Sequence, residues 1–268
     1  LTVDTIAPTQ PSITTTTSLT NDSTPAIEGV AEAGSTVTLF VDGETTGVTA
    51  TADGTTGAYT IAPTEALSDG AYALTVTATD AAGNISDASD SLSITIDATA
   101  PGKPSIITTT SLTNDATPTI EGIAEAGSTV ELFNGDASLG TTTADETTGA
   151  YTITPAELSD GDYSLTVTAT DAAGNISAAS DALSITVDAT APTQPAITTT
   201  TTLTTNATPT IEGTAEAGST VTLLSGGVEI GTTTANGDGQ FSITTSTLAD
   251  SNYVLTVTAT DAAGNISD

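Results

Sequence analysis

The sequence repeats itself with a period of about 91 residues, and this repeat limits the possible fold more than any other feature. The heptapeptide Asp-Ala-Ala-Gly-Asn-Ile-Ser occurs at 80–86, 171–177 and 261–267. Ile-Glu-Gly, and then Ala-Glu-Ala-Gly-Ser-Thr-Val, precede it in every copy. Solenoid proteins have a repeat of about 20–50 residues. The longer period is the size of a whole domain, so it predicts a tandem array of domains.

The repeat divides the chain into three modules, which we place at 5–97, 98–188 and 189–268. Residues 1–4 are interpreted as the end of a preceding module. The third module stops where its seventh strand should begin, so we expect a six-stranded sandwich with an open edge. An open sheet edge presents unpaired N–H and C=O groups and invites pairing with another chain.

Within one period the side chains alternate as they do in half-buried β-strands. Residues 72–78 read Tyr-Ala-Leu-Thr-Val-Thr-Ala, which places apolar residues on one face and threonines on the other. We predict seven strands in the first module: 11–16, 24–31, 35–42, 45–52, 57–62, 70–79 and 90–97. Seven short strands in about 90 residues is typical of an immunoglobulin-like sandwich. The predicted fold is all-β, with tandem immunoglobulin-like Greek-key β-sandwiches of about seven strands each, arranged as an elongated rod.

One tyrosine recurs at the start of the sixth strand of each module. Tyr72, Tyr163 and Tyr253 each follow a Leu-x-Asp sequence. A tyrosine corner occupies this position in related sandwiches, with its hydroxyl bonded to the backbone a few residues upstream. We therefore interpret these three tyrosines as buried structural residues and not as ligand contacts.

The composition excludes several classes of function. The chain has 33 acidic residues, no histidine, no cysteine and Lys103 as its only basic residue, for a net charge of −32. Such a chain cannot neutralise phosphates, and we predict neither nucleic-acid binding nor insertion into a membrane, since no long apolar run occurs. Catalysis by an imidazole base requires a histidine, and we predict that the protein is not an enzyme. The high charge favours a soluble monomer.

The repeated motifs resemble those of the bacterial Ig-like repeats of giant adhesins. The resemblance rests on Thr-Pro-x-Ile-x-Gly-x-Ala-Glu-x-Gly-Ser-Thr-Val, a Gly-x-Tyr strand and Thr-Ala-Thr-Asp-Ala-Ala-Gly-Asn, and it covers nearly the whole chain. These adhesins are the type I-secreted RTX and biofilm-associated surface proteins. The resemblance implies an extracellular extender region on a bacterial cell surface, which holds a distal ligand-binding domain away from the cell. It also implies that neighbouring modules contact one another and bind Ca²⁺ where they meet.

The predicted topology gathers acidic residues at the joints. In a Greek-key sandwich the chain entry and three of the loops share one pole, which in the second module brings together Asp97, Glu125 and Asp171. Three carboxylates repel each other unless a cation bridges them. Ca²⁺ binds about six to eight oxygen ligands and would suit such a site. The corresponding sets are Asp4, Glu32 and Asp80 in the first module, and Asp188, Glu216 and Asp261 in the third. The alternative is that these are solvated loop acids without a metal.

Two other functions remain open from the sequence. The first is a module that binds carbohydrate or protein directly, or that mediates homotypic cell–cell adhesion. Its weakness is that the chain has only eight aromatic residues, 5 Tyr and 3 Phe, and binding hot spots are enriched in Trp, Tyr and Arg. A spacer within a large secreted enzyme is the second.

Overall fold

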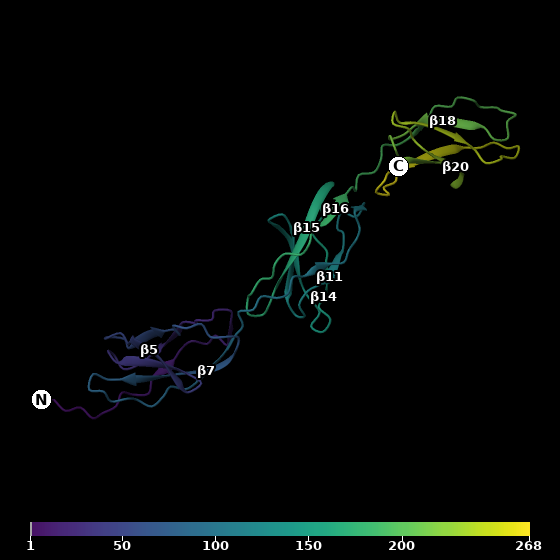
Figure 1. Ribbon diagram of the computed structural model, residues 1–268. Helices are drawn as coiled ribbons and strands as arrows, with labels where there is room; N and C mark the ends of the chain where they lie inside the picture. Colours follow the sequence, from purple (N-terminus) through teal and green to yellow (C-terminus); the bar gives the residue numbers. More distant parts are fainter. Residues whose placement is uncertain (1) are drawn as a thin grey trace.

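The computed structural model describes residues 2–268, and in this part of the chain every regular element is a β-strand. Three separate sandwiches follow one another along the chain, each with its own buried core. Figure 1 shows them as an extended array, with the N-terminus at the outer end of the first module. The all-β fold of tandem immunoglobulin-like modules is therefore confirmed.

The first module consists of two sheets that pack face to face. Its strands are β1 (Ser12–Ile13), β2 (Leu19–Thr20), β3 (Ile27–Val30), β4 (Thr36–Val41), β5 (Glu44–Thr51), β6 (Ala58–Ile61), β7 (Gly70–Thr79) and β8 (Leu92–Ile96). One sheet has the order β1-β3-β6 and the other the order β2-β8-β7-β4-β5. Strands that are distant in sequence are neighbours in both sheets, as the Greek-key prediction requires.

The second module repeats this topology strand for strand. Its strands are β9 (Ser105–Ile106), β10 (Leu112–Thr113), β11 (Ile120–Ile123), β12 (Thr129–Asn134), β13 (Ala137–Thr143), β14 (Ala150–Ile153), β15 (Gly161–Thr170) and β16 (Leu183–Val187). The sheet orders are β14-β11-β9 and β10-β16-β15-β12-β13.

The third module has a smaller second sheet. Its strands are β17 (Ala196–Ile197), β18 (Thr210–Thr214), β19 (Thr220–Ser225), β20 (Val228–Thr234), β21 (Gln240–Thr244) and β22 (Leu255–Thr260). The sheets have the orders β17-β18-β21 and β20-β19-β22. Among the described residues, this module has no counterpart of β10 or β16.

The core follows directly from the alternation in the sequence. In β7 the side chains of Leu74, Val76 and Ala78 are fully buried, while the threonines between them face outward. Valine, isoleucine and threonine suit such half-buried pleated surfaces because their branched side chains pack well against cross-strand neighbours. The same pattern recurs in β15, so each module fills its core with aliphatic side chains from both sheets.

The first predicted strand, 11–16, is wrong in one respect. β1 covers only residues 12–13 and pairs antiparallel with β3. The chain then crosses to the other sheet, where β2 pairs parallel with β8, Leu19 lying opposite Thr95. The module therefore has eight strands instead of seven. The threonine-rich segment between β1 and β2 has no alternation that marks this crossing.

The tyrosine corners are confirmed, although their burial was overestimated. The hydroxyl groups of Tyr72, Tyr163 and Tyr253 donate to the carbonyl oxygens of Ser68, Ser159 and Ala249, at 3.0, 2.8 and 3.0 Å. Each tyrosine bonds four residues back and closes the turn before its strand. The first two are half-buried and Tyr253 is exposed.

A second tyrosine fixes the first strand of each of the first two modules. Tyr151 donates its hydroxyl to the carbonyl of Ser105, at 2.9 Å, and its ring lies over Gly122. A Cβ at Gly122 would overlap both groups. Burial raises the pKa of Tyr151 to about 12, which keeps the hydroxyl protonated as a donor. This contact was not predicted from the sequence.

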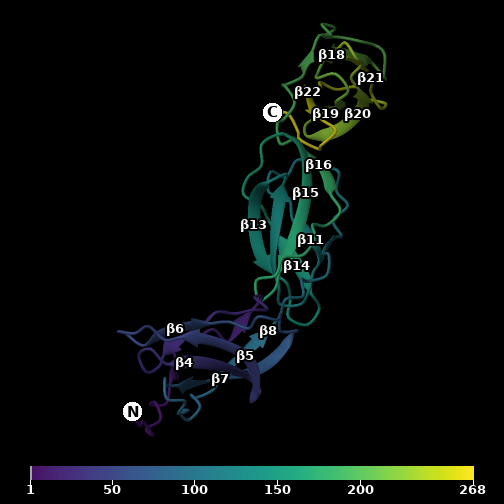
Figure 2. The ribbon, with the colours of Figure 1, turned by 60° about the vertical axis from the view of Figure 1, so that its left-hand side comes forward.

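The modules are arranged end to end but not in a straight line. Figure 2 shows the first module inclined to the direction of the other two. Within the described residues, no helix is long and apolar enough to cross a membrane.

Candidate functional site

The loop after β15 and its counterparts after β7 and β22 are each closed by hydrogen bonds between an aspartate and an asparagine. Asp171 Oδ1 accepts the backbone N–H of Asn175 at 2.9 Å, and its Oδ2 accepts the side-chain amide of Asn175 at 2.8 Å. Gly174 has a φ of +93°, a conformation that glycine adopts without steric cost. Asp80 and Asp261 make the same pair of bonds in the loops after β7 and β22.

These hydrogen bonds hold the loop aspartates in their ionised form. The pKa of Asp80 is lowered chiefly by the side-chain hydrogen bond from Asn84. Burial raises the pKa of Asp171, but hydrogen bonds from the side chain and backbone of Asn175 and from neighbouring backbone N–H groups outweigh it, so that the pKa falls below its usual value. Asp261 has the same balance of causes and direction. The carboxylates thus serve as hydrogen-bond acceptors that shape the loop.

The asparagine of the same loop bridges two modules. Asn175 Nδ2 donates to the carbonyl oxygen of Asp97 at 2.7 Å, and the backbone N–H of Asp97 donates to the Thr20 carbonyl of its own module at 3.0 Å. One linker residue is therefore bonded on both sides of the joint. At the second joint Asn265 makes the equivalent bond to Asp188, at 2.6 Å.

A second aspartate holds each linker from the side of the preceding module. Asp69 Oδ1 accepts the backbone N–H of Ala98 at 2.7 Å, and its Oδ2 accepts the hydroxyl of Thr99. The hydroxyl bond and then the backbone bond lower the pKa of Asp69. Asp160 repeats the arrangement at the second joint. The Leu-x-Asp motif predicted only the tyrosine corner, although its aspartate recurs in every module and this recurrence was a signal for a second role.

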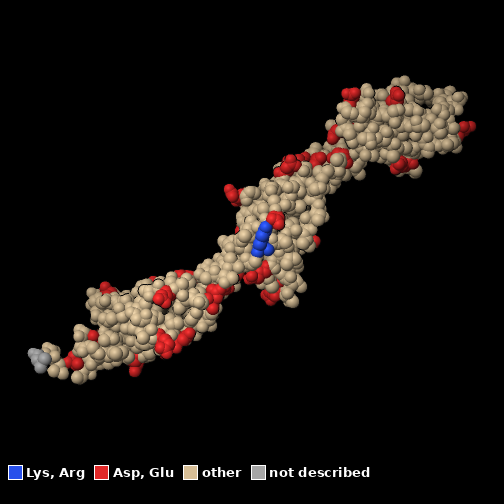
Figure 3. Space-filling model, viewed as in Figure 1, with Lys and Arg blue, Asp and Glu red and all other residues tan. Residues whose placement is uncertain are grey.

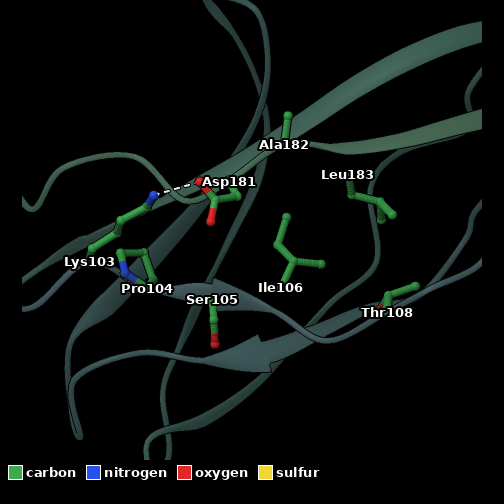
Figure 4. A pocket seen from close by; sticks show the side chains of 8 residues that line it. All are labelled: Lys103, Pro104, Ser105, Ile106, Thr108, Asp181, Ala182 and Leu183. Atoms are coloured by element: carbon green, nitrogen blue, oxygen red, sulfur yellow. Dashed lines mark hydrogen bonds and ion pairs between the residues drawn. The ribbon is translucent and has the colours of Figure 1, made fainter.

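Lys103, the only basic residue of the sequence, attaches a linker to its module through an ion pair. Lys103 Nζ lies 2.7 Å from Asp181 Oδ1, beside a hollow of about 350 Å³ that Ile106, Thr108 and Leu183 help to line (Figure 4). In the first module Gln10 Nε2 donates to the Ala88 carbonyl in the corresponding place, at 2.6 Å. The amide of Gln10 and the ammonium group of Lys103 each attach the linker to the module that follows it. We therefore interpret the hollow beside Lys103 as a structural feature of the linker.

The predicted metal ligands are only partly brought together. The main-chain carbonyl of Asp97, not its carboxylate, shares the amide of Asn175 with the Asp171 carboxylate. The carbonyl of Asp188 and the carboxylate of Asp261 share Asn265 in the same way. Asp4 likewise approaches Asn84, which lies 3.3 Å from its carbonyl oxygen. The three glutamates share the expected pole, but no hydrogen bond among residues 2–268 involves their carboxylates, which belong to exposed residues: Glu32, Glu125 and Glu216.

The acidic side chains at the joint do not converge on one point among residues 2–268. Among residues 2–268, no group of three or more acidic, histidine or cysteine side chains is placed to hold one. The oxygens that would face a cation, Asp171 Oδ2 and the Asp97 carbonyl, both accept hydrogen bonds from Asn175 Nδ2. The asparagine amide thus occupies the position between them. On the face of the molecule shown in Figure 3, acidic side chains are spread along all three modules.

The fold and the joints together define a class of protein: tandem immunoglobulin-like sandwiches connected by short, hydrogen-bonded linkers. The chain belongs to the family described as bacterial Ig-like domain, whose profile matches residues 2–98, 105–189 and 192–268. The three matches correspond to the three sandwiches.

The proteins and solved structures that are similar to the chain include the following three. Exoglucanase B of Cellulomonas fimi is 36% identical over 237 residues, which are 81% of this chain and 21% of that protein. Chitinase A1 of Niallia circulans is 34% identical over 151 residues, 52% of this chain and 19% of that protein. The chain thus spans about a fifth of the length of either relative. A tetra-tandem repeat from the extending region of a large adhesion protein is 25% identical, with a TM-score of 0.30, covering 97% of this chain and 72% of that structure.

Proposed function

We propose that the chain is an extracellular spacer, the extender region of a bacterial surface adhesin, which holds a distal binding domain away from the cell. The observation that carries the proposal is the bonding of each linker to both modules. Asp97 is bonded to Thr20 behind it and to Asn175 ahead of it, so hydrogen bonds on both sides of the linker oppose bending of the joint. Family membership and the sequence motifs support the same function.

A spacer within a large secreted enzyme is the second candidate. It is favoured by the 36% identity to part of exoglucanase B. The two candidates share one physical role, which is to separate two other parts of a protein. They differ in what the chain is attached to, and neither requires the modules themselves to bind a ligand.

The spacer role has a direct test in solution. Small-angle X-ray scattering should give an elongated particle whose radius of gyration changes little between about 0.05 and 0.5 M NaCl, conditions that alter the screening of surface charge severalfold. A chain with freely flexible joints would instead contract as salt screens its net charge. A pull-down with insoluble cellulose and chitin distinguishes the spacer from a carbohydrate-binding module, since a spacer remains in the supernatant.

Calcium stiffening of the joints is a separate hypothesis, which rests on the sequence resemblance. Ca²⁺ and the Asn175 Nδ2 group would compete for the carbonyl oxygen of Asp97. The amide would therefore have to move away from this oxygen for the metal to bind there. The test is scattering before and after EDTA, together with calorimetric titration of CaCl₂ into the stripped chain. Two or three saturable sites support the hypothesis. An unchanged radius of gyration and no saturable binding would leave a metal-independent spacer.

A further inference from the structure

Two of the nine asparagines in the sequence, Asn134 and Asn236, precede a glycine. Glycine has no side chain to shield its backbone nitrogen, and this nitrogen can attack the side-chain carbonyl carbon of the residue before it. An asparagine before glycine is therefore especially prone to lose its side-chain amide in water. Which of the two asparagines reacts in the folded chain depends on how the structure holds each side chain.

Asn134 lies at the turn of the hairpin formed by β12 and β13. It is the last residue of β12, and its pairs with Ala137 of β13 and Leu165 of β15 are the last of their ladders. Gly135, which begins the turn, is exposed and has a φ of +60°. Apart from its chain neighbours, no atom lies within 4 Å of the position that a Cβ would take at Gly135. The end of a ladder opens more readily than its interior, so this peptide unit can rearrange without unfolding the module.

The side chain of Asn134 is held by one long hydrogen bond. Its Oδ1 accepts the backbone N–H of Ser164 at 3.2 Å, the upper end of the usual range of about 2.7–3.2 Å for such bonds. This bond withdraws electron density from the side-chain carbonyl carbon, which favours attack there. Among residues 2–268, no hydrogen bond engages the Nδ2 group of Asn134, so the protein does not retain the group that would leave.

Asn236 is held more firmly. Its Oδ1 accepts two backbone N–H groups, from Asp238 at 3.0 Å and from Gln240 at 2.9 Å. Its own backbone N–H donates to the carbonyl of Gln240, and its carbonyl accepts from Gly239, each at 2.9 Å. The side-chain carbonyl can turn toward Gly237 only after both side-chain bonds break. One additional hydrogen bond that must break slows the reaction roughly fivefold.

The asparagines of the joint loops are protected in a different way. Each precedes an isoleucine, whose branched side chain is stiff and shields the backbone nitrogen. Each also has its Nδ2 group bonded to the aspartate of its loop, at 2.7 or 2.8 Å. The three residues are Asn84, Asn175 and Asn265. Loss of the amide from Asn134 would therefore leave the bridging amides of the joints in place.

We propose that Asn134 is a site of spontaneous deamidation in the folded protein. The backbone nitrogen of Gly135 attacks Cγ of Asn134 and forms a new C–N bond. The bond between Cγ and Nδ2 breaks, and the amide leaves as ammonia with the proton from the Gly135 nitrogen. Water then opens the cyclic imide and gives an aspartyl or an isoaspartyl residue at this position. Either product adds one negative charge to the chain, and no oxidant or reductant is needed.

The first module shows that such a hairpin accommodates a carboxylate. Asp42 Oδ1, from the first turn position of the hairpin between β4 and β5, accepts the backbone N–H of Ala73 at 2.8 Å. Ala73 is the counterpart of Ser164 in the repeat. A carboxylate is a stronger acceptor than an amide, so the aspartyl product keeps the bond from Ser164. The isoaspartyl product instead lengthens the main chain by one carbon before Gly135 and shifts the turn.

Mass spectrometry of the full chain, aged at mildly alkaline pH, tests the proposal. The folded chain should gain the mass difference between an amide and an acid, and fragmentation of the wild type should locate this gain at Asn134. The reaction there should be at least about fivefold faster than at Asn236. Asn134→Asp should abolish the first gain, whereas the matched control Asn236→Asp should retain it.

The unfolded chain supplies the reference rate. In concentrated guanidinium chloride both side chains are free, so Asn134 and Asn236 should react at similar rates. A folded chain that gains no mass while the unfolded chain reacts at both sites would overturn the proposal. A folded chain in which Asn236 reacts first, or a gain that persists in Asn134→Asp, would overturn it as well. No outcome bears on the spacer role, because the hydrogen bonds of the joints do not involve Asn134.

Discussion

The side-chain amide of Asn175 in the second module lies 2.7 Å from the main-chain carbonyl oxygen of Asp97, the last residue of the first module. The same amide is bonded to Asp171 Oδ2, at 2.8 Å, so its position is fixed from within its own module. Asp69 holds the next residues of the linker from the other side. The orientation of one module relative to the next therefore depends on a few polar groups whose geometry is set inside each sandwich.

Replacing the bridging amide by a carboxylate should make the joint depend on cations. Asn175→Asp places a second carboxylate beside Asp171 and removes the donor to the Asp97 carbonyl. Like charges at this distance repel unless a cation lies between them. We expect the variant to bind Ca²⁺ at least about tenfold more tightly than the wild type, a difference of about 1.4 kcal/mol, by calorimetric titration.

The matched control for this change is Asn206→Asp. It adds the same charge in the third module, at a position where the first two modules already have an aspartate, Asp22 and Asp115. Calcium affinity should not change in the control. Equal affinities in wild type and Asn175→Asp would show that the oxygens at the joint cannot converge on an ion.

The loop aspartates should make stability depend on pH in one direction. Backbone N–H and hydroxyl groups of Thr148, and then the N–H of Thr147, lower the pKa of Asp145 below 3.8, its value in an unfolded chain. A group with a lowered pKa in the folded state stabilises it fully above the unfolded value and loses that contribution as the pH falls through the folded value. Asp145→Asn should therefore lower the melting temperature at pH 7.

The difference between wild type and Asp145→Asn should shrink below about pH 3.8 and vanish at lower pH. Melting curves from pH 7 to pH 2 measure it, and taking the difference removes the common effect of neutralising the other acids. The third module has Asn236 in the same place, so the substitution is compatible with the loop. A difference that stays constant across this range would mean that the carboxylate charge has no part in holding the turn.

The contact between Gly122 and Tyr151 predicts a large loss of stability. In Gly122→Ala the new Cβ would overlap the Ser105 carbonyl and the Tyr151 hydroxyl, both of which are fixed by their mutual hydrogen bond. Overpacking of this kind costs about 2–3 kcal/mol, which lowers the melting temperature of a module of this size by about 10 °C or more. Calorimetry should show one module melting early.

Gly102→Ala is the control, because no atom lies within 4 Å of the Cβ it would add. Its melting profile should match the wild type. Equal melting profiles for Gly122→Ala and wild type would contradict the close packing of Tyr151 on Gly122 in the sheet β14-β11-β9.

The fold could be predicted from the sequence because its evidence is local and repeated. Alternation along β7 sets which side chains enter the core, and the three copies of the Asp-Ala-Ala-Gly-Asn loop place the ends of three sandwiches. The crossing from β1 to β2 could not be predicted, since Leu19 pairs with a strand that lies more than 70 residues away in sequence. Parallel pairing of two residues leaves no periodic pattern.

The joint was only partly predictable for a different reason. The linker and the loop after the sixth strand do lie together, since the Asp97 carbonyl and Asp171 Oδ2 both accept from the amide of Asn175. The bridging role of Asn175 was not predicted, because the sequence does not distinguish an asparagine that only forms a turn from one that also bonds to a neighbouring module. The exposed carboxylate of Glu125 makes no hydrogen bond in the described part of the chain. A shared pole therefore does not by itself bring side chains into contact.

The central claim, that hydrogen-bonded linkers hold the modules in a defined orientation, is tested most directly by electron–electron distance measurements. The chain has no cysteine, so spin labels at Ser93→Cys and Ser184→Cys, both exposed, report only on the first joint. We predict a narrow distance distribution that broadens in Asn175→Ala, where the loss of about 1 kcal/mol raises the open population roughly fivefold. Asn84→Ala removes the same amide from the first module, away from this joint, and should leave the distribution narrow. A broad distribution in the wild type, or one that Asn175→Ala does not change, would contradict the account.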